Sequence, residues 1–217
     1  MPELEDAAAQ LTGVMRRIEE VFLHGVEGVT EIWLIRHADC YTDLKQVGDP
    51  PLSDVGRRQS ALLAERVRKA GVAAVYASDS IRAVQTAEAI GMAVAQDERL
   101  REIQNDPSAA VQVVLNKNLT YSESAAQVQK RMTAAVEEIA ARHRGERVAV
   151  VSHGVAILLY TCSVMRLEFS ELRLLPYYTS VTVVRVHSDR TMVGSLVDAT
   201  HLIGLDQSPV YGVVKSR

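Results

Sequence analysis

The segment Ile32–Asp39 constrains the fold of this chain more than any other stretch. Its first four residues, Ile32–Ile35, are apolar, follow soon after Gly28 and end at Arg36 and His37. A short apolar run between turn residues is typical of a strand that is buried on both faces of a parallel sheet. Ligands of open α/β sheets bind beyond the carboxyl ends of the strands, so we expect Arg36 and His37 to lie at a binding site.

Two later apolar runs are followed by polar residues in the same way. The run 72–76 leads into a helix that carries Arg82 in its first turn, and the run 147–151 leads into His153. Taken singly, each of these residues has a structural interpretation, such as capping carbonyl groups or forming a surface ion pair. The carboxyl ends of parallel strands meet at one edge of a sheet, so the recurrence favours one shared site.

Apolar periodicity and turn residues predict alternating strands and helices. The predicted strands cover residues 32–35, 72–76, 94–96, 147–151, 179–187 and 191–197, the last two as a hairpin. The predicted helices cover residues 3–23, 53–70, 80–90, 122–143 and 155–165. This order predicts an α/β fold: a three-layer α/β/α sandwich with a mostly parallel central sheet, an antiparallel C-terminal edge and an extra N-terminal helix.

Length and composition predict one folded domain, at residues 25–217, after an N-terminal helical extension at 1–24. The net charge of −3 gives no electrostatic argument for nucleic acid or an anionic membrane. There is no signal peptide pattern and no apolar run near the ~18 residues that span a bilayer, so we expect a cytoplasmic protein. Two cysteines, Cys40 and Cys162, are too few for a disulfide framework, and no metal-binding spacing suggests a metal site.

The N-terminal helix carries an apolar stripe with spacings that alternate between four and three. Its positions are Leu4, Ala8, Leu11, Met15, Ile18 and Phe22. The pattern has two interpretations: the helix lies on its own domain, or it forms a short dimer seam that would make the protein a homodimer. Gly13 would weaken an isolated coiled coil, and the sequence leaves both interpretations open.

Five ordered blocks of the sequence carry a resemblance to a known family. They are Leu34–Ala38, Pro51–Gln59, Tyr76–Ala87, Leu100–Ile103 and Val150–Gly154. In this order they resemble the motifs of the histidine phosphatase superfamily, which includes cofactor-dependent phosphoglycerate mutases and broad phosphatases. The resemblance extends from about residue 31 to about residue 190, so the N-terminal helix lies outside it.

The resemblance implies roles for five residues. His37 would attack phosphorus and form a phosphohistidine, and Glu102 would protonate the leaving oxygen. Arg36, Arg82 and His153 would surround the transferred phosphoryl group. These residue types suit the reaction, because phosphoryl transfer needs in-line positioning and positive charge around the equatorial oxygens, which guanidinium groups supply without titrating. No cofactor and no metal are implied.

Two residues depart from the family pattern. Ala38 replaces the usual glycine after the histidine, which is tolerable if the backbone there does not need a positive φ. Asp43 stands near the position of an asparagine that helps to bind phosphate in many members, which makes it a candidate phosphate-binding position. A carboxylate there would repel the substrate, so the loop is either rearranged or faces a cationic substrate group.

Three activities fit these residues. Phosphoglycerate mutases resemble one another in a much longer insertion than the segment from Ile103 to Tyr121, and a short cover leaves a phosphoenzyme open to water. We therefore expect hydrolysis of a phosphomonoester, with a small phosphorylated metabolite as substrate. Sugar phosphates, phosphoglycerate derivatives and phosphohistidine proteins all fit. The alternatives are a cofactor-dependent phosphoglycerate mutase and a low-activity regulatory protein that binds a phosphorylated ligand.

Overall fold

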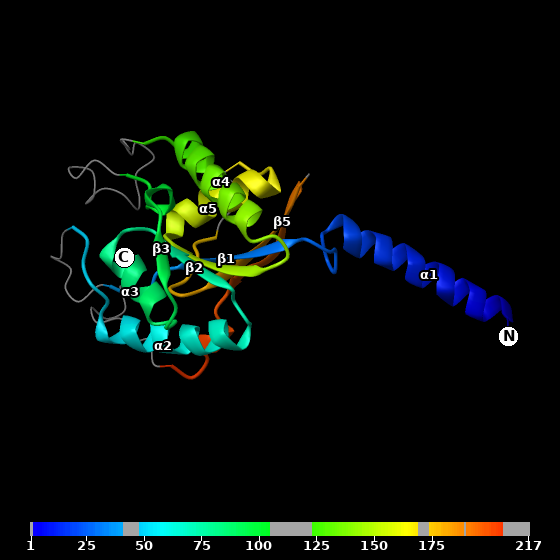
Figure 1. The fold of residues 1–217 in the computed structure, drawn as a ribbon, viewed down its shortest axis with the longest axis horizontal. Helices are drawn as coiled ribbons and strands as arrows, with labels where there is room; N and C mark the ends of the chain where they lie inside the picture. Colours follow the sequence, from blue (N-terminus) through cyan, green and yellow to red (C-terminus); the bar gives the residue numbers. More distant parts are fainter. Residues whose placement is uncertain (1, 41–47, 105–122, 169–173, 189, 206–217) are drawn as a thin grey trace, which may run out of the picture.

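The computed structural model describes residues 2–40, 48–104, 123–168, 174–188 and 190–205, with the backbone alone for 2–10 (Figure 1). Within these residues, six strands form one sheet in the order β3-β2-β4-β1-β5-β6. They are β1 Thr30–Arg36, β2 Ala74–Ala77, β3 Val94–Gln96, β4 Arg147–Ser152, β5 Val181–His187 and β6 Arg190–Asp198. Strands β1 to β4 are parallel, and β5 and β6 form antiparallel pairs at one edge, as predicted.

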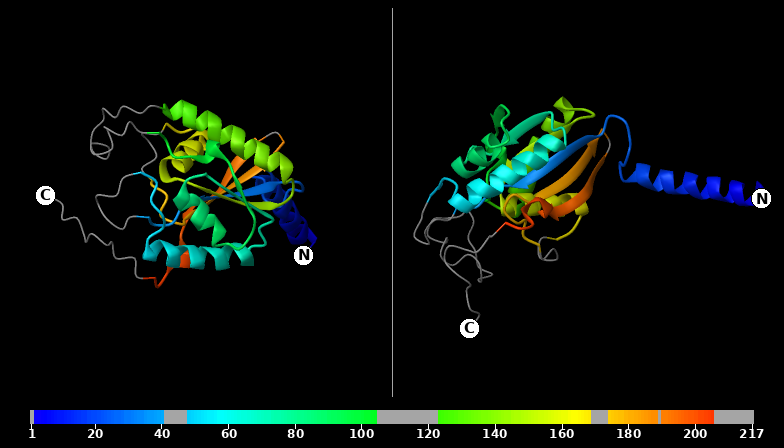
Figure 2. Two further views of the ribbon diagram at one scale, coloured as in Figure 1. Left: turned by 60° about the vertical axis from the view of Figure 1, so that its left-hand side comes forward. Right: turned by 90° about the horizontal axis from the view of Figure 1, so that it is seen from below.

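Helices cover both faces of this sheet. The described helices are α1 Pro2–Val21, α2 Asp54–Lys69, α3 Ile81–Glu88, α4 Ala125–Arg142 and α5 Gly154–Met165, with 3₁₀ turns η1 Glu98–Leu100 and η2 Thr200–Leu202. Helices α2 and α3 pack on one face, and α4 and α5 pack on the other (Figure 2). The predicted three-layer α/β/α sandwich is confirmed.

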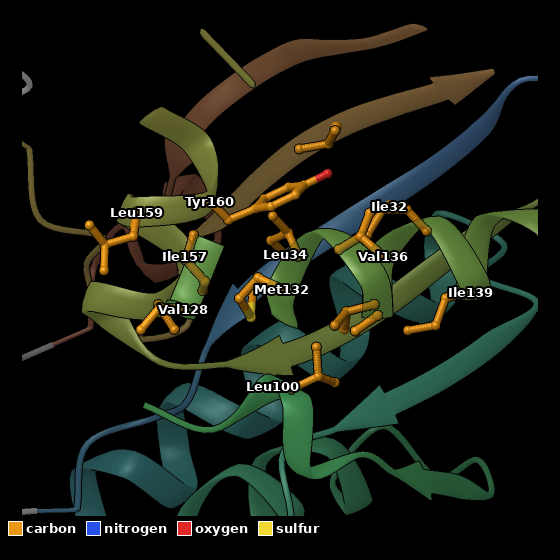
Figure 3. Packing of buried hydrophobic residues seen from close by; sticks show 14 of the residues in the cluster. Ile32, Leu34, Leu100, Val128, Met132, Val136, Ile139, Ile157, Leu159 and Tyr160 are labelled. Carbon is orange, nitrogen blue, oxygen red and sulfur yellow. The ribbon is translucent and has the colours of Figure 1, made fainter. Parts of the chain in front are cut away.

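Strand β1 contributes to both hydrophobic cores, because successive side chains of a strand point to opposite faces of the sheet. Ile32 and Leu34 belong to the core under α4 and α5, which also holds Tyr160 (Figure 3). Trp33 and Ile35 belong to the core under α2 and α3. Burial on both faces explains why this strand is a continuous apolar run rather than an alternating one.

Local signals set most helix ends. The sequence allows Ser53 or Asp54 as the N-cap of α2, and the structure has Ser53, whose side chain accepts from the backbone N–H of Gly56. Gly71 and Gly145, at φ +67° and +80°, follow α2 and α4. Helix α4 begins later than the predicted residue 122, because Ser124 and Gln127 form a capping box.

Helix α1 extends away from the sheet and its covering helices in each view (Figures 1 and 2). The large apolar side chains described from residue 11 to 22 are exposed, with exposed fractions of 65% for Leu11, 51% for Met15 and 53% for Phe22 just beyond the end of α1. The interpretation that this helix lies on its own domain is therefore wrong, and the dimer seam stays a prediction. In the described part of the chain, no helix is both long enough and apolar enough to cross a membrane.

Candidate active site

Three parallel strands end at one edge of the sheet and bring the predicted site residues together. Arg36, the last residue of β1, lies opposite Ser152, the last residue of β4. The next residue, His37, donates its backbone N–H to the Ser152 carbonyl oxygen at 2.9 Å. Ser78, which follows β2, donates its backbone N–H to the Val151 carbonyl oxygen at 2.9 Å. Hydrogen bonds beyond the strand ends therefore fix the backbone on which the site is built.

His37 is buried, and its two ring nitrogens have different partners. Nδ1 lies 2.8 Å from the carbonyl oxygen of Ala38, and because a carbonyl only accepts, Nδ1 carries the proton. Nε2 then presents a lone pair, which accepts from Nε of Arg82 at 3.3 Å. The backbone thus selects the tautomer in which Nε2 can act as a nucleophile.

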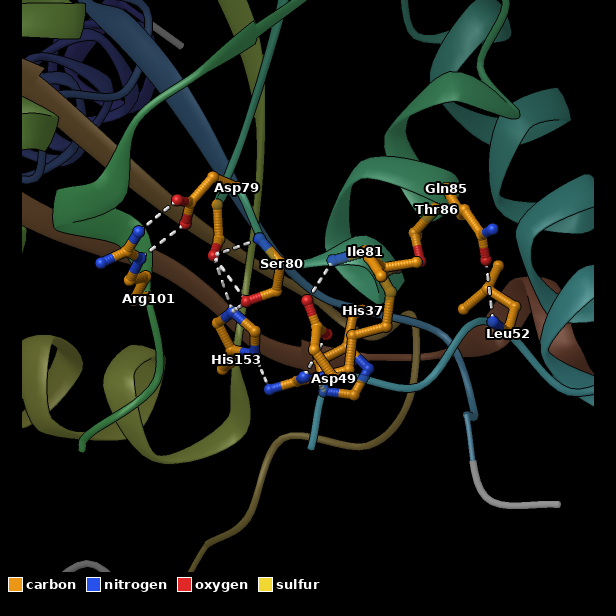
Figure 4. A network of polar contacts seen from close by, with 12 residues as sticks. His37, Asp49, Leu52, Asp79, Ser80, Ile81, Gln85, Thr86, Arg101 and His153 are labelled. Carbon is orange, nitrogen blue, oxygen red and sulfur yellow. Dashed lines mark hydrogen bonds and ion pairs between the residues drawn. The ribbon is translucent and has the colours of Figure 1, made fainter. Parts of the chain in front are cut away.

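Arg82 contacts both histidines from the first turn of α3. Besides its contact with His37, it donates from Nη2 to Nδ1 of His153 at 3.2 Å. His153 therefore carries its proton on Nε2, which lies 2.9 Å from Oγ of Ser78 (Figure 4). The ring centroids of His37 and His153 are 5.1 Å apart. One guanidinium group thus connects the histidines that follow β1 and β4.

Arg36 presents an unpaired donor to the same region. Its Nη1 donates to the Pro176 carbonyl oxygen at 2.7 Å, and its Cζ lies 4.0 Å from the ring centroid of Tyr178. Its Nε is buried and has no hydrogen-bond partner among the described residues. The approach depends on Gly154, since a Cβ there would lie 3.3 Å from that Nε. A buried donor without an acceptor is costly, and a phosphoryl oxygen would satisfy it.

The electrostatics of the site keep both histidines neutral near pH 7. Burial, followed by the charges of Arg82 and Arg36, lowers the pKa of His37 from 6.5 to about 3. Burial is also the main reason why the pKa of His153 lies well below its usual value, with further lowering by His37 and Arg82. A neutral imidazole keeps its lone pair, as nucleophilic attack requires.

Glu102 is held by the N-terminus of α5. Its carboxylate oxygens accept from the backbone N–H of Val155 at 3.1 Å and of Ala156 at 2.8 Å, and from its neighbour Ile103 at 2.9 Å. His153, the N-cap residue of α5, makes no capping bond with its side chain, so Glu102 supplies the cap from a distant turn. These bonds fix the Glu102 carboxylate beside the residues that directly follow His153.

Of the predicted site residues, the structure brings Arg36, His37, Arg82 and His153 into contact or close proximity. It sets Glu102 against the start of the helix that follows His153. Asp43 lies outside the described residues, so its phosphate contact stays a prediction.

Sequence reasoning missed three residues that shape the site. Asp49 accepts from Nη1 of Arg82 at 2.7 Å, and Tyr178 lies under Arg36. Arg131 of α4 donates to the carbonyl oxygen of Glu102 at 3.2 Å and thereby supports the turn that carries it. All three act across long sequence separations and carry no local motif, so no signal in the sequence marked them.

Three other residues at this edge have structural explanations. Ser152 donates its hydroxyl to the Leu100 carbonyl oxygen at 2.7 Å, which agrees with a structural role rather than that of a hydrolase nucleophile. Burial raises the pKa of the Cys40 thiol to about 11, so this residue is not a reactive thiolate at neutral pH. Ala38 is not among the described residues with positive φ, which explains why an alanine is tolerated there.

The comparison with protein families agrees with this geometry. The model of the histidine phosphatase superfamily (branch 1) matches residues 32–199. The chain belongs to this superfamily. It is therefore an enzyme of the histidine phosphatase class, and the matched range contains each residue of the site described above while leaving α1 outside.

Proteins similar to this chain include a probable phosphoglycerate mutase, and chains of similar fold include a phosphoserine phosphatase. A probable phosphoglycerate mutase GpmB of Yersinia pestis (strain Pestoides F) is 28% identical over 152 residues, covering 58% of this chain and 71% of that protein. The structure of Bacillus stearothermophilus YhfR is 28% identical with a TM-score of 0.67, covering 80% of this chain and 99% of that one. A mutant phosphoserine phosphatase from Entamoeba histolytica in complex with phosphoserine is 19% identical with a TM-score of 0.64, over 80% and 99% of the two chains, which shows the shared fold.

Proposed function

We propose that the protein hydrolyses phosphomonoesters without a metal ion, through a phosphohistidine at Nε2 of His37. The observation that carries this proposal is the state of the His37 ring. Its Nδ1 proton is committed to a backbone carbonyl, and its Nε2 lone pair lies among two guanidinium groups at the carboxyl edge of the sheet. A nucleophile surrounded by fixed cations suits an anionic electrophile such as a phosphoryl group.

In the first step, Nε2 of His37 attacks phosphorus, the N–P bond forms, and the bond from phosphorus to the leaving oxygen breaks. Glu102 is the acid that supplies the proton taken up by that oxygen. In the second step water attacks the phosphohistidine, Glu102 accepts a proton from the water, and the N–P bond breaks to release inorganic phosphate. The same carboxyl group therefore acts as acid and then as base.

The cations bind and orient the phosphoryl group. Arg36 offers its unpaired Nε, and Arg82 can exchange its contacts with the histidine nitrogens for phosphoryl oxygens. His153 has protein partners at both nitrogens, so it donates to phosphate only after its Nε2–H leaves Ser78. Guanidinium groups keep their charge at every relevant pH, which makes them suited to the developing equatorial charge.

Hydrolysis is favoured over mutase transfer by the short segment from Ile103 to Tyr121, most of which lies outside the described residues. A longer cover would be needed to exclude water while a phosphoryl group waits for its second acceptor. The substrate class is a small phosphorylated metabolite. Phosphoserine, bound by the similar Entamoeba histolytica enzyme, belongs with sugar phosphates and phosphoglycerates in the panel to be assayed.

The decisive experiment measures phosphate release from p-nitrophenyl phosphate in EDTA. We expect turnover by the wild type and its loss, by at least about a thousandfold, in His37→Ala, because the nucleophile is removed. The matched control is His187→Ala, since His187 ends β5 at the opposite edge of the sheet. Phosphate release that survives His37→Ala would sink the mechanism, and turnover that requires a divalent metal would overturn its metal independence.

Two further arms separate the alternatives. Faster isomerisation of 3-phosphoglycerate, primed with bisphosphoglycerate, than hydrolysis of any monoester would identify a mutase. Tight phosphate binding without His37-dependent turnover would identify a binding protein. For Glu102→Gln we expect a larger loss on an alkyl phosphate than on p-nitrophenyl phosphate, because nitrophenolate leaves without protonation.

A further inference from the structure

Asp49 links the start of α3 to the guanidinium group of Arg82. One carboxylate oxygen, Oδ2, accepts from the backbone N–H of Ile81 at 2.7 Å (Figure 4). The other, Oδ1, accepts from Nη1 of Arg82 at 2.7 Å and forms an ion pair with it. Neither contact is required by a motif, and Asp49 lies more than thirty residues from both partners in sequence.

The first contact replaces a missing helix cap. Ser80 is the N-cap residue of α3, yet its side chain makes no capping hydrogen bond, because its Oγ faces Ser78 and His153 instead. Asp49 supplies the acceptor from outside, as Glu102 does for α5. A cap needs only one oxygen, so the second oxygen of Asp49 is available to act on Arg82.

The second contact governs the orientation of Arg82. Of the three contacts that its guanidinium makes with Asp49, His37 and His153, the one to Asp49 is the shortest, at 2.7 Å against 3.3 and 3.2 Å. A charge-assisted hydrogen bond is also stronger than one to a neutral imidazole. Because the guanidinium group is planar, fixing Nη1 and the chain direction also fixes where Nε and Nη2 point.

The segment that carries Asp49 is itself anchored on α3. Leu52 donates its backbone N–H to Oε1 of Gln85 at 2.8 Å, and Pro50 and Pro51 restrict the backbone between the two contacts. Asp49 and Arg82 are partly shielded, with side-chain exposures of 39% and 17%. The carboxylate is therefore held in place by backbone geometry as well as by its own two bonds.

We propose that Asp49 is the positioning residue for Arg82 in phosphoryl transfer, an inference that rests on the proposed function. It holds Nη1, so that Nε and Nη2 remain directed at the position between His37 and His153 where the phosphoryl group is transferred. It does not touch the reacting atoms. Its contribution is the pre-set orientation of a cation that would otherwise sample several rotamers.

A double-mutant cycle with Arg82 tests this role. We expect Asp49→Ala to lower kcat about 10- to 100-fold, as small displacements of catalytic groups do. In the Arg82→Ala background, the same change should alter kcat less than about twofold, because Asp49 acts through Arg82. The kcat of Asp49→Asn should lie between those of Asp49→Ala and the wild type. The amide oxygen can accept from only one of the two donors, and the NH₂ group opposes the other. The control is Asp54→Asn, an exposed carboxylate of α2 that pairs with Arg57.

Affinity for orthovanadate, measured by calorimetry on the same proteins, gives a readout that does not depend on turnover. Weakening in Asp49→Ala that disappears in the Arg82→Ala background supports the proposal. The proposal is overturned if Asp49→Ala weakens vanadate binding equally in the wild-type and Arg82→Ala backgrounds. It is also overturned if Asp49→Ala leaves kcat unchanged or binds vanadate more tightly. A lower Tm with unchanged kcat would leave Asp49 as a helix cap and also overturn it. Absence of His37-dependent turnover in the wild type refutes the proposed function, while the vanadate cycle still decides the role of Asp49.

Discussion

Arginines lie at both ends of the parallel strands, here called the amino edge and the carboxyl edge of the sheet, but their donors have different partners. At the amino edge, Arg147 and Arg185 both donate to Glu31, with Arg147 Nε at 2.7 Å from it, and Arg147 also donates to the Ala70 carbonyl oxygen. At the carboxyl edge, the buried Nε of Arg36 has no partner in the part of the chain that the structure describes. Arg82 shares its donors between one carboxylate and two histidines.

A cavity of about 530 Å³ lies at the amino edge and is lined in part by Glu31, Arg147 and Arg185. A cavity lined by cations is therefore not sufficient to mark the site. What distinguishes the carboxyl edge is a buried arginine Nε without a partner among the described residues, together with histidines that burial keeps neutral. Arg36 therefore points to a ligand site, because one of its buried donors has no acceptor among the described residues.

Replacing one arginine at each edge by alanine should give the largest difference in kcat/KM. Arg82→Ala should lower kcat/KM by about a thousandfold or more, because a cation that stabilises the transferred phosphoryl group is lost. Arg147→Ala should leave kcat/KM within about twofold but reduce the free energy of unfolding by about 1 kcal/mol, a value discounted for the partial exposure of its ion pair with Glu31. Steady-state kinetics and urea unfolding measure the two quantities. A loss of turnover in Arg147→Ala would erase the distinction between the edges.

The pH dependence of stability should also differ between the two variants. The pKa of His37 is about 3 in the folded protein and 6.5 in the unfolded chain, so between these values the unfolded state binds the extra proton. Stability should therefore fall as the pH decreases from about 6.5 towards 3, with His153 contributing in the same direction. His201, with a pKa lowered to about 4, adds a constant part of this loss in both variants.

Urea unfolding at pH 7 and at about pH 3.5, close to the folded-state pKa of His37, measures this loss. Removing Arg82, the second cause of the lowered His37 pKa, should make the loss smaller than in wild type, whereas Arg147→Ala should leave it unchanged. Equal losses in all three proteins would contradict this account of the buried histidines.

Gly154→Ala should give a smaller, local effect. The added Cβ would lie 3.3 Å from Nε of Arg36 and 3.3 Å from a methyl carbon of Leu175, so Arg36 must shift by a few tenths of an ångström. We expect phosphate affinity to weaken a few-fold with Tm nearly unchanged, because alanine is well tolerated within a helix. Calorimetric titration with phosphate checks this. Wild-type affinity would mean that the position of Arg36 is less constrained than Gly154 implies.

Removal of residues 2–22 should have the smallest effect on turnover. Helix α1 precedes the start of β1 and extends away from the sheet, whereas His37 follows the end of β1, so kcat should remain within about twofold of wild type. Its exposed apolar side chains predict that the full chain is a dimer and that the shortened chain is a monomer in sedimentation experiments. A full chain that sediments as a monomer would refute the dimer seam.

The fold could be predicted from the sequence to a large extent, because its signals are local. Ser53 and the glycines after α2 and α4 mark helix ends, and apolar runs mark the strands of the parallel sheet. The predicted strand bounds are less accurate, because the pairing between strands sets them. The sequence predicts a strand at 72–76, but β2 spans Ala74–Ala77, because Val148 to Val151 of β4 set its register. No property of the β2 segment alone encodes that register.

The sequence by itself determined which residues could perform phosphoryl transfer and on which strand ends they lie. It did so because motif residues and hydrophobic periodicity are properties of neighbouring positions along the chain. Only the tertiary structure decided the tautomer of His37, the capping of α5 by Glu102 and the contact between Asp49 and Arg82. The reason is physical: hydrogen bonds and burial depend on which distant segments are packed together, and that packing assigns each donor its acceptor.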